Sequence, residues 1–339
     1  MKNSSRLKFN EYLARVATIN AVGVSDTCKT FSVDPSVQQT LETKQQESSA
    51  FLSKINVVGV DEQMGAKLGI GLSGPVASRT NTNVSDRQTK DLSTIDSKGY
   101  LCVHTDFDTH LKYAKIDAWA KFKDFQVRVA NSILKRQALD RIMIGFNGVS
   151  AAAQTDPVVN PMLQDVNKGW LQHLREDAPQ NVLSSGKTPG KIIIGGAAAA
   201  RDFANLDAAV MDAITLLDPW HQQDPDLIVI LGRELMHDKY FPLVDIDQAP
   251  SEMLAADIVI SQKRVGGLQA AAVPFFPPRA LMVTTYDNLS LYWQEGGRRR
   301  HIIDNPKRSQ IENYESSNDA YVVEDNGRAA LVEKIELAV

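Results

Sequence analysis

The sequence has few cysteines, little net charge and no long hydrophobic run. Two cysteines among 339 residues exclude a disulfide framework and a four-thiolate zinc site, and they fit a reducing compartment. The formal net charge of −4 does not indicate a strongly basic nucleic-acid-binding protein. No apolar run approaches the roughly 20 residues that cross a bilayer, and the basic N-terminus lacks the apolar stretch of a secretory signal. We therefore expect a soluble protein, made inside a cell, with no membrane partner.

Motifs that carry chemistry are equally sparse. The run Gly69–Gly74 matches G-x-G-x-x-G, but Pro75 and a polar loop follow where a dinucleotide site needs a helix. A glycine-rich strand is the favoured interpretation, and a nucleotide-dependent enzyme is the alternative. His and Asp alternate along His104–His110, yet side chains two apart on a strand lie about 7 Å apart, so four cannot converge on one metal ion. We expect no catalytic residue, no bound metal and no cofactor.

The most prominent feature that is present is a long helical pattern over Ile116–Phe146. Apolar residues recur there close to helical spacing, and the stretch contains no Pro and no Gly before Gly145. Asp117 is predicted to cap its start, and the run from Gly145 to Gly148 is predicted to end it. At roughly 1.5 Å per residue, such a helix would be about 45 Å long. This length indicates a molecule that spans a distance and points to architecture before chemistry.

Residues 1–31 are predicted to form a separate, basic unit with a short amphipathic helix, because apolar residues from Phe9 to Val16 follow helical spacing. Asp34-Pro35 predicts the cap and first turn of a second helix, which is expected to continue through Val37, Leu41, Phe51 and Ile55. Two interpretations of residues 1–31 stay open: a terminal helix docked on the body, or a detachable scaffold or pro-segment. The residues alone favour the docked helix.

An extended arm is predicted between the second helix and the long one. Apolar runs alternate there with the polar stretch Ser78–Lys98, and Leu101–Tyr113 alternates between an apolar and a polar face. The pattern predicts a long two-stranded arm with a polar tip. An isolated hairpin is marginal in water, so we expect another subunit to stabilise it.

The remaining sequence predicts an α+β fold in which the chain leaves one domain and returns to it. Helical stripes and the buried-strand pattern Asp226–Leu231 indicate a compact α/β region at about 165–280. Strands dominate from Ala280 onward. The densest positive cluster contains Arg298, Arg299 and Arg300. It is interpreted either as a contact for phosphates or an acidic neighbour, or as an exposed loop balanced by nearby acidic residues.

This order of parts resembles the major capsid proteins of tailed phages, which have the Hong Kong phage fold. It resembles most closely the peduoviruses, the temperate enterobacterial myophages. The resemblance runs over nearly the whole chain in one order, which makes it more specific than a short motif. The matching stretches are Arg6–Arg15, Phe31–Val37, Gln46–Ser49, Trp119–Phe125, Ile133–Asp140, Gly145–Val149, Asn160–Asp165, Ser251–Ala256, Ile260–Arg264 and Glu312–Ser316.

The resemblance implies a division of the chain into named parts. The long helix would be the spine of a peripheral domain, into which an axial domain is inserted. The extended loop would lie over a neighbouring subunit. The implied parts are a scaffold-like pro-segment (1–31), an N-terminal arm (32–60), the extended loop (61–110), the peripheral domain with the spine helix (111–164), the axial domain (165–280) and the returning peripheral strands (281–339).

The resemblance also implies a function. The chain would self-assemble into pentamers and hexamers of an icosahedral head shell around double-stranded DNA, assembled in the bacterial host cytoplasm and retained in the virion. Scaffold, maturation protease and portal would be its partners. The protease would remove the N-terminal segment near Thr30-Phe31, which favours the pro-segment interpretation. The family implies no catalytic residue.

Overall fold

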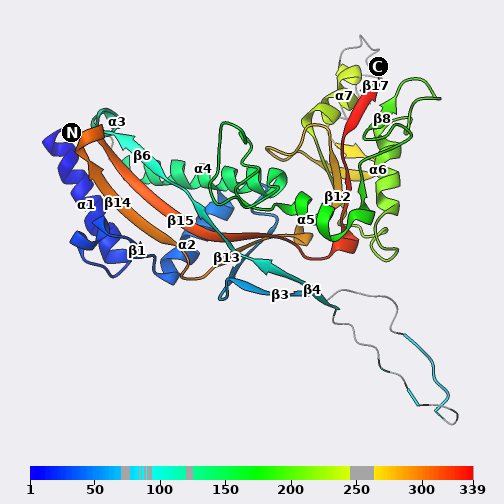
Figure 1. Ribbon diagram of the computed structural model, residues 1–339, viewed down its shortest axis with the longest axis horizontal. Coiled ribbons are helices and arrows are strands. Elements are labelled where there is room, and N and C mark those ends of the chain that lie inside the picture. The colour runs from blue at the N-terminus through cyan, green and yellow to red at the C-terminus, as the bar shows by residue number, and fades with distance from the viewer. Residues whose placement is uncertain are drawn as a thin grey trace. The chain divides into compact units, whose positions relative to one another are not determined.

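The computed structural model divides the chain into two compact units (Figure 1). Unit 1 contains residues 1–63, 101–172 and 289–322, and unit 2 contains residues 64–100, 173–288 and 323–339. The chain therefore leaves unit 1 and returns to it twice. None of the described helices is long and apolar enough to cross a membrane. The structure describes residues 1–69, 77–82, 84, 86–87, 89, 94–119, 125–244 and 263–338.

Unit 1 is built on a seven-stranded sheet whose central strand is the 14-residue β15. The order is β1-β14-β15-β13-β2, and β5 and β6 also pair with β15. β14 and β15 are antiparallel from Arg299↔Ser316 to Asn305↔Gln310, whereas β13 and β2 are parallel. The strands are β1 (Phe31–Ser32), β2 (Asn56–Val60), β5 (Val103–Asp106), β6 (Thr109–Lys112), β13 (Leu289–Gln294), β14 (Arg299–Asn305) and β15 (Gln310–Val323).

The two predicted N-terminal helices are present, but the prediction that residues 1–31 form a separate unit is wrong, because these residues pack within unit 1. Asp34 caps the second helix, since its Oδ1 accepts a hydrogen bond from the Ser36 backbone N–H at 2.9 Å. That helix ends at Glu47, so the apolar residues Phe51 and Ile55 lie beyond it. The helices of unit 1 are α1 (Asn3–Ile19), α2 (Pro35–Glu47), α3 (Tyr113–Trp119) and α4 (Phe125–Asn147), with short 3₁₀ turns at Val24–Cys28 and Pro306–Arg308.

The long helical pattern corresponds to α3 and α4, and residues 120–124 between them lie outside the described residues. The predicted cap at Asp117 is wrong, because helix α3 already begins at Tyr113 and includes Asp117. The predicted end is confirmed at Asn147, where the Gly148 N–H donates to the Ile144 carbonyl at 2.7 Å. Gly145 is required for packing, since a Cβ there would lie 2.2 Å from the Trp170 ring.

An aromatic cluster closes this end of unit 1. Trp170 packs edge-on against Phe146 and Tyr321, with ring centroids 5.0 and 5.3 Å away, and Phe51 completes the cluster. The Trp170 Nε1–H donates to the Ser290 carbonyl at 2.9 Å, so its one polar atom is satisfied in the interior. The cluster therefore joins the end of α4 to the sheet.

The arm is present as β3 (Met64–Gly69) and β4 (Thr94–Leu101), which form a two-stranded sheet of their own. The prediction that Leu101–Tyr113 is one strand of this arm is wrong for residues 103–112, because β5 and β6 pair with β15. An alternating pattern identifies a strand but not its partner. The predicted faces are also reversed at the junction: Cys102 separates β4 from β5 and is buried, while Leu101 is 54% exposed.

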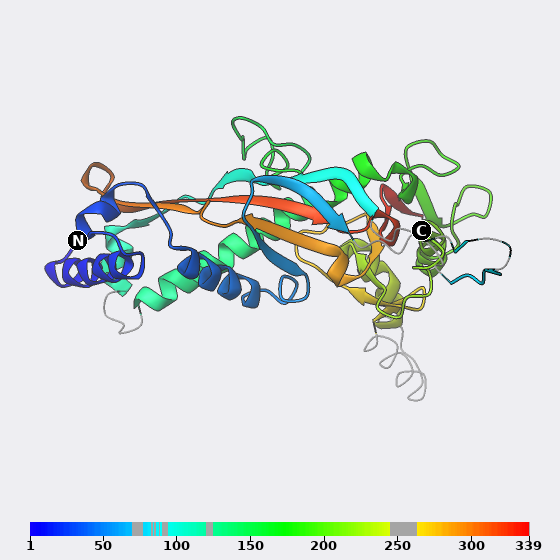
Figure 2. The same ribbon diagram turned by 90° about the horizontal axis from the view of Figure 1, so that it is seen from below.

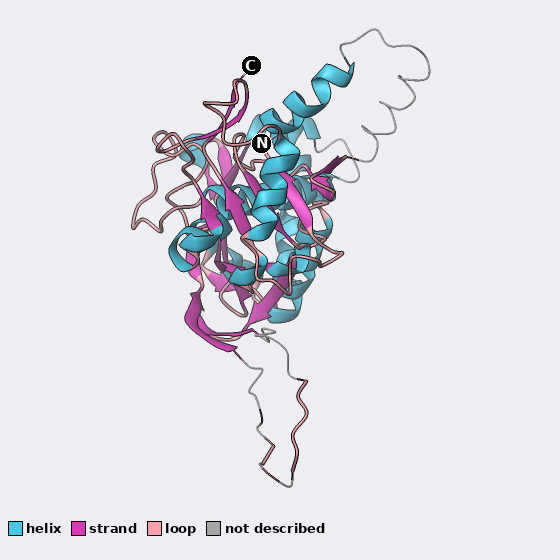
Figure 3. Ribbon diagram, turned by 90° about the vertical axis from the view of Figure 1, so that its right-hand side faces the viewer, coloured by secondary structure: helices cyan, strands magenta, loops and turns pink. Residues whose placement is uncertain are grey.

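Unit 2 combines a six-stranded sheet with helices (Figure 3). All four residues of β9 are buried, which confirms the predicted buried strand, and α6 packs its apolar face on the same core. The sequence of Ser251–Lys263 fits either a helix or a strand, and residues 251–262 lie outside the described residues. The sheet order is β10-β11-β9-β12-β16-β7, and β8 pairs with β17.

The elements of unit 2 that surround this core are mostly short. They are β7 (Val182–Leu183), β8 (Ile192–Gly195), α6 (Leu206–Thr215), β9 (Ile228–Leu231), α7 (Arg233–Val244), β10 (Arg264–Val265), β11 (Leu268–Ala271), β12 (Leu281–Thr284), β16 (Ala330–Val332) and β17 (Ile335–Ala338), with 3₁₀ turns at Pro179–Asn181, Tyr286–Asn288 and Asn326–Arg328; α5 (Trp170–Asp177) connects the units along the chain.

Candidate functional site

Residues 1–30, called here the N-terminal segment, are docked on the body of unit 1 (Figure 2). Their apolar side chains join a cluster with residues from β14, β15 and α3. Removing the segment would uncover this apolar surface, which is costly in water. The cluster consists of Val16, Phe31, Val33, Ile116, Ile302 and Ile311, with Met1, Phe9, Tyr12, Leu13, Val22, Val37, Leu41, Leu111 and Tyr113 packed against it.

Three polar contacts fix the same segment along its length. The Lys2 backbone N–H donates to Asp117 Oδ1 at 2.8 Å, so Asp117 binds the segment. Arg6 pairs with Asp304 at 2.9 Å. The contacts continue with Tyr12, whose hydroxyl accepts a hydrogen bond from an Arg300 Nη2–H at 2.7 Å.

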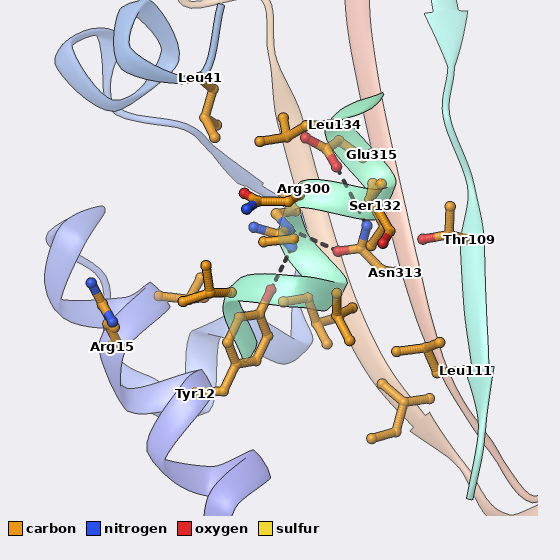
Figure 4. A pocket seen from close by; sticks show the side chains of 18 of the residues that line it. Tyr12, Arg15, Leu41, Thr109, Leu111, Ser132, Leu134, Arg300, Asn313 and Glu315 are labelled. Atoms are coloured by element: carbon orange, nitrogen blue, oxygen red, sulfur yellow. Dashed lines mark hydrogen bonds between the residues drawn. The ribbon is translucent and has the colours of Figure 1, made fainter. Parts of the chain in front are cut away.

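A cavity of about 520 Å³ lies between helix α1 and the body (Figure 4). Helices α1, α2 and α4 and strand β6 all contribute to its mostly apolar wall. The chain Tyr12–Arg300–Asn313–Glu315 runs along one side as successive hydrogen bonds. The N-terminal segment therefore covers this face with incomplete packing.

The predicted processing site Thr30-Phe31 lies where an exposed stretch meets a buried strand. Thr30 is exposed, as are Cys28 and Lys29 before it. Phe31 is only 8% exposed and pairs with Arg300 in the sheet. A protease that binds extended chain on both sides of the bond would have to displace β1 or reach it before β1 docks.

A buried charge network lies behind the docked segment and joins α2, α4 and β15. Its members recur at spacings that put them on one face of each element: i, i+3 on α2, i, i+4 on α4 and period two on β15. Figure 2 shows α2 and α4 side by side. The network comprises Glu42, Gln45, Gln137, Arg141, Arg298, Glu315, Ser317 and Asp319, all less than 9% exposed.

Arg141 is the centre of the network. Its Nε and Nη2 donate to the two carboxylate oxygens of Asp319 at 2.8 and 2.9 Å, a bidentate pair. Its Nη1 donates to Gln45 at 2.8 Å and also pairs with Glu42. The guanidinium thus holds helix α2 and strand β15 against helix α4.

Arg298 forms a second centre that shares Glu42. Its Nη1 donates to Glu42 at 2.7 Å, and its Nε donates to Glu315 at 2.9 Å. Burial alone would raise the pKa of Glu42, but the charges of Arg141 and Arg298 outweigh burial and lower it. Glu42 is therefore held ionised between two guanidinium groups.

Glu315 gives the network a defined pH dependence. Burial opposes its ionisation, but Arg298 and Arg300 outweigh burial and lower its pKa from 4.5 to about 2. A carboxylate with a depressed pKa stabilises the fold fully above its unfolded pKa, and this stabilisation is lost as the pH falls through the folded pKa. The contribution of Glu315 is therefore complete above about pH 4.5 and disappears towards about pH 2.

We expect Glu315→Gln to flatten the dependence of unfolding free energy on pH between about 4.5 and 2. Urea unfolding at a series of pH values measures this slope. The control is Glu11→Gln on the exposed face of α1, which should leave the slope unchanged. Equal slopes for the Glu315 variant and the unmodified chain would contradict the prediction.

The interpretation of Arg298, Arg299 and Arg300 as one outward-facing basic cluster is wrong for Arg298. Its side chain is 1% exposed and bound within the charge network. Arg300 is partly buried, and it donates to Asn313 and to Tyr12. Side chains alternate between the faces of a strand, so only Arg299, which is exposed, remains available to a partner.

The other sequence motifs do not form a chemical centre. His104 contacts Asn318 and Asp106 at 3.1 Å on an exposed face of the sheet. Within the described ranges, no group of three or more His, Cys, Asp and Glu side chains is arranged to hold a metal ion. Gly69 is the last residue of β3, and residues 70–74 lie outside the described residues, so the glycine-rich strand over Gly69–Gly74 stays a prediction.

The fold described above is that of the major capsid proteins of tailed phages, the Hong Kong phage capsid fold. The capsid subunit of an empty GTA particle matches it with a TM-score of 0.51 at 15% identity, over 85% of this chain and 90% of that one. This likeness shows the fold alone. The chain belongs to the P2 family of phage major capsid proteins, whose family model matches residues 8–335.

Relatives within the family match over almost their whole length. The chain is 50% identical to the capsid protein of Escherichia phage P2, over 99% of this chain and 96% of that protein. It is 39% identical to the major capsid protein of Serratia phage KSP20, over 100% and 98%. A chain from the satellite phage P4 procapsid has a TM-score of 0.82 and 47% identity, covering 100% of this chain and 99% of that one. The resemblance identified from the sequence is confirmed.

Sequence reasoning missed the charge network. Its signal was present: Gln38, Glu42 and Gln45 form a polar stripe on the inner face of α2, where an apolar stripe is normal. Glu315, Ser317 and Asp319 repeat at period two in β15, which puts them on one face of the strand. Neither pattern identifies Arg141 as the partner, because Glu42 and Asp319 lie 99 and 178 positions away from it in the sequence.

Proposed function

We propose that the chain is the repeating subunit of an icosahedral phage head shell, in which it forms pentamers and hexamers around double-stranded DNA. Membership of the P2 family of phage major capsid proteins over residues 8–335 carries this proposal. The similar chain of the satellite phage P4 procapsid comes from an assembled precursor shell, which supports it. Assembly takes place in the bacterial host cytoplasm, with scaffold, maturation protease and portal as partners, and the product remains in the virion.

We assign parts of the fold to parts of the shell on the same basis. The residues of the extended loop, 61–110, contain the β3–β4 ribbon, which pairs with no third described strand. We propose that this ribbon lies on a neighbouring subunit. The region 165–280 would act as the axial domain around five-fold and six-fold axes, and residues 111–164 and 281–339 as the peripheral domain. Arg299 is the residue of the basic cluster proposed to meet an acidic neighbour or DNA phosphate.

Electron microscopy of the purified full-length chain tests the proposal. Closed shells, or rings of five and six subunits, are expected when the chain is expressed with its phage scaffold. A product that stays monomeric with the scaffold present at every concentration would overturn the proposal. Expression without the scaffold is the control that separates self-assembly from scaffold dependence.

We further propose that a phage protease cuts between Thr30 and Phe31 during maturation. The exposed stretch that ends at Thr30 supports this position, because a protease needs accessible chain. Mature particles are expected to contain a chain that begins at Phe31. Intact-mass measurement of subunits from purified particles checks this, and a mass that retains Met1–Thr30 would contradict it.

A further inference from the structure

The N-terminal segment is docked on the body through an apolar cluster and through polar contacts at Lys2, Arg6 and Tyr12. We propose that cleavage at Thr30-Phe31 does not by itself release the segment, and that its docking face on unit 1 binds it as a separate basic amphipathic peptide. This proposal rests on the processing step proposed above. It assigns the face a partner, the cut segment of the same chain, and makes release a second event.

The docking face combines an apolar floor with acidic groups at the far end. Val33, Ile302 and Ile311 belong to the core cluster on the body side and are each less than 9% exposed with the segment in place. Asp117 and Asp304 bind the first turns of α1 through Lys2 and Arg6. None of these contacts involves the bond that is cut.

The charge of the segment matches this face. Residues 1–30 carry five basic side chains and two acidic ones. The amino group of Met1 lies 3.9 Å from an Asp117 oxygen, so it adds to the attraction. Opposite charges at the contact favour rebinding over escape, most strongly at low salt.

Arg300 requires the segment for a reason beyond charge. Its guanidinium is held inside by Asn313 at 2.7 Å and by the Tyr12 hydroxyl at 2.7 Å. Departure of Tyr12 would remove one of these two acceptors from the partly buried guanidinium of Arg300. Tyr12 is therefore a specific anchor as well as an apolar one.

The cavity of about 520 Å³ beneath α1 means that only part of the inner face of this helix packs against the body. The segment is thus held by its apolar contacts and polar ends, with part of its inner face unsupported. This arrangement suits a peptide that persists after the cut and can still be displaced when the shell rearranges.

The test cuts the full chain without the phage enzyme. A recognition sequence for a site-specific protease is inserted between the exposed residues Lys29 and Thr30, and unassembled subunits are cut at micromolar concentration. Unassembled subunits are used because a closed shell would trap a free peptide. Size-exclusion chromatography followed by mass spectrometry of the subunit fraction then measures the retained segment.

We expect the segment to co-elute with the body after complete cutting. The double variant Arg6→Ala/Tyr12→Phe should release it about tenfold faster in a displacement assay with excess unlabelled peptide. The matched control is Leu7→Ala on the same helix, since Leu7 is 65% exposed and should leave the release rate unchanged.

Two results would overturn the inference. The first is immediate separation of the segment from the unmodified body. The second is retention that is identical in the double variant, which would mean that other contacts hold it. The inserted site is cut without the phage protease, so this test does not depend on where the phage protease cuts. The proposed cut at Thr30-Phe31 is tested separately by the mass of subunits from mature particles.

Discussion

Gly99→Val is expected to abolish shell assembly while the thermal stability of the subunit changes little. Gly99 lies in β4, opposite Gly65 of the paired strand β3. A Cβ at position 99 would lie 2.4 Å from the Gly65 carbonyl oxygen. Backbone cannot yield as a flexible side chain can, so the valine must push the two strands apart. The ribbon is a separate two-stranded sheet, and its loss leaves the two larger sheets intact.

The size of the assembly effect follows from repetition. A closed shell repeats each contact in every subunit, so a contact that is weak alone gains strength through avidity. If the ribbon lies on a neighbour, disrupting it removes that contact everywhere at once. Yield of shells by sedimentation and melting temperature of unassembled subunits measure the two halves of the prediction.

Asp61→Val is the control for the added side chain. Asp61 is exposed and lies three residues before β3, outside the contact between β3 and β4. Shells should form in normal yield. Normal assembly of Gly99→Val would mean that the ribbon is dispensable, whereas a large fall in its melting temperature would mean that the ribbon also supports the fold of the subunit.

The parts of the fold that the sequence predicts well are those with strong local signals. Asp34-Pro35 marks the start of α2, and Gly145 to Gly148 mark the end of α4, because caps and glycines act on neighbouring backbone. The apolar run within Asp226–Leu231 is a buried strand for a similar reason. These local signals do not give the topology, which was predicted from the resemblance of the whole chain to the phage capsid proteins.

The errors come from contacts between residues far apart in sequence. Leu101–Tyr113 reads as one strand of a hairpin, yet the partner of β5 and β6 is β15, about 200 residues later. In the sequence, Arg298 is interpreted as part of a surface cluster because the residues that follow it are Arg299, Arg300 and His301. One of its two acidic partners, Glu42, is 256 residues away and cannot be seen in a local window.

Arg141→Met is expected to lower the free energy of unfolding by about 3–5 kcal/mol, the usual cost of removing one partner from a buried ion pair. Methionine keeps most of the volume and removes the charge. Asp319 then loses both donors of its bidentate pair, and Glu42 loses one of its two guanidinium partners. These carboxylates remain buried in the core of unit 1, where an unpaired charge is expensive.

The matched control lies one turn earlier on the same helix. Arg136 also pairs with an acid, Asp140 at 2.6 Å, but its side chain is 59% exposed, so Arg136→Ala should cost about 0.3–0.5 kcal/mol. Denaturant unfolding of both variants at neutral pH measures the two losses of unfolding free energy.

The comparison distinguishes the buried charge network from an ordinary surface ion pair. If the two variants lose the same unfolding free energy, the network contributes no more than a set of solvent-screened ion pairs. A large cost confined to Arg141 would mean that charge helps to hold helix α2, the first helix after the processing site, on the body, since the fully buried residues of this helix are Gln38, Glu42 and Gln45.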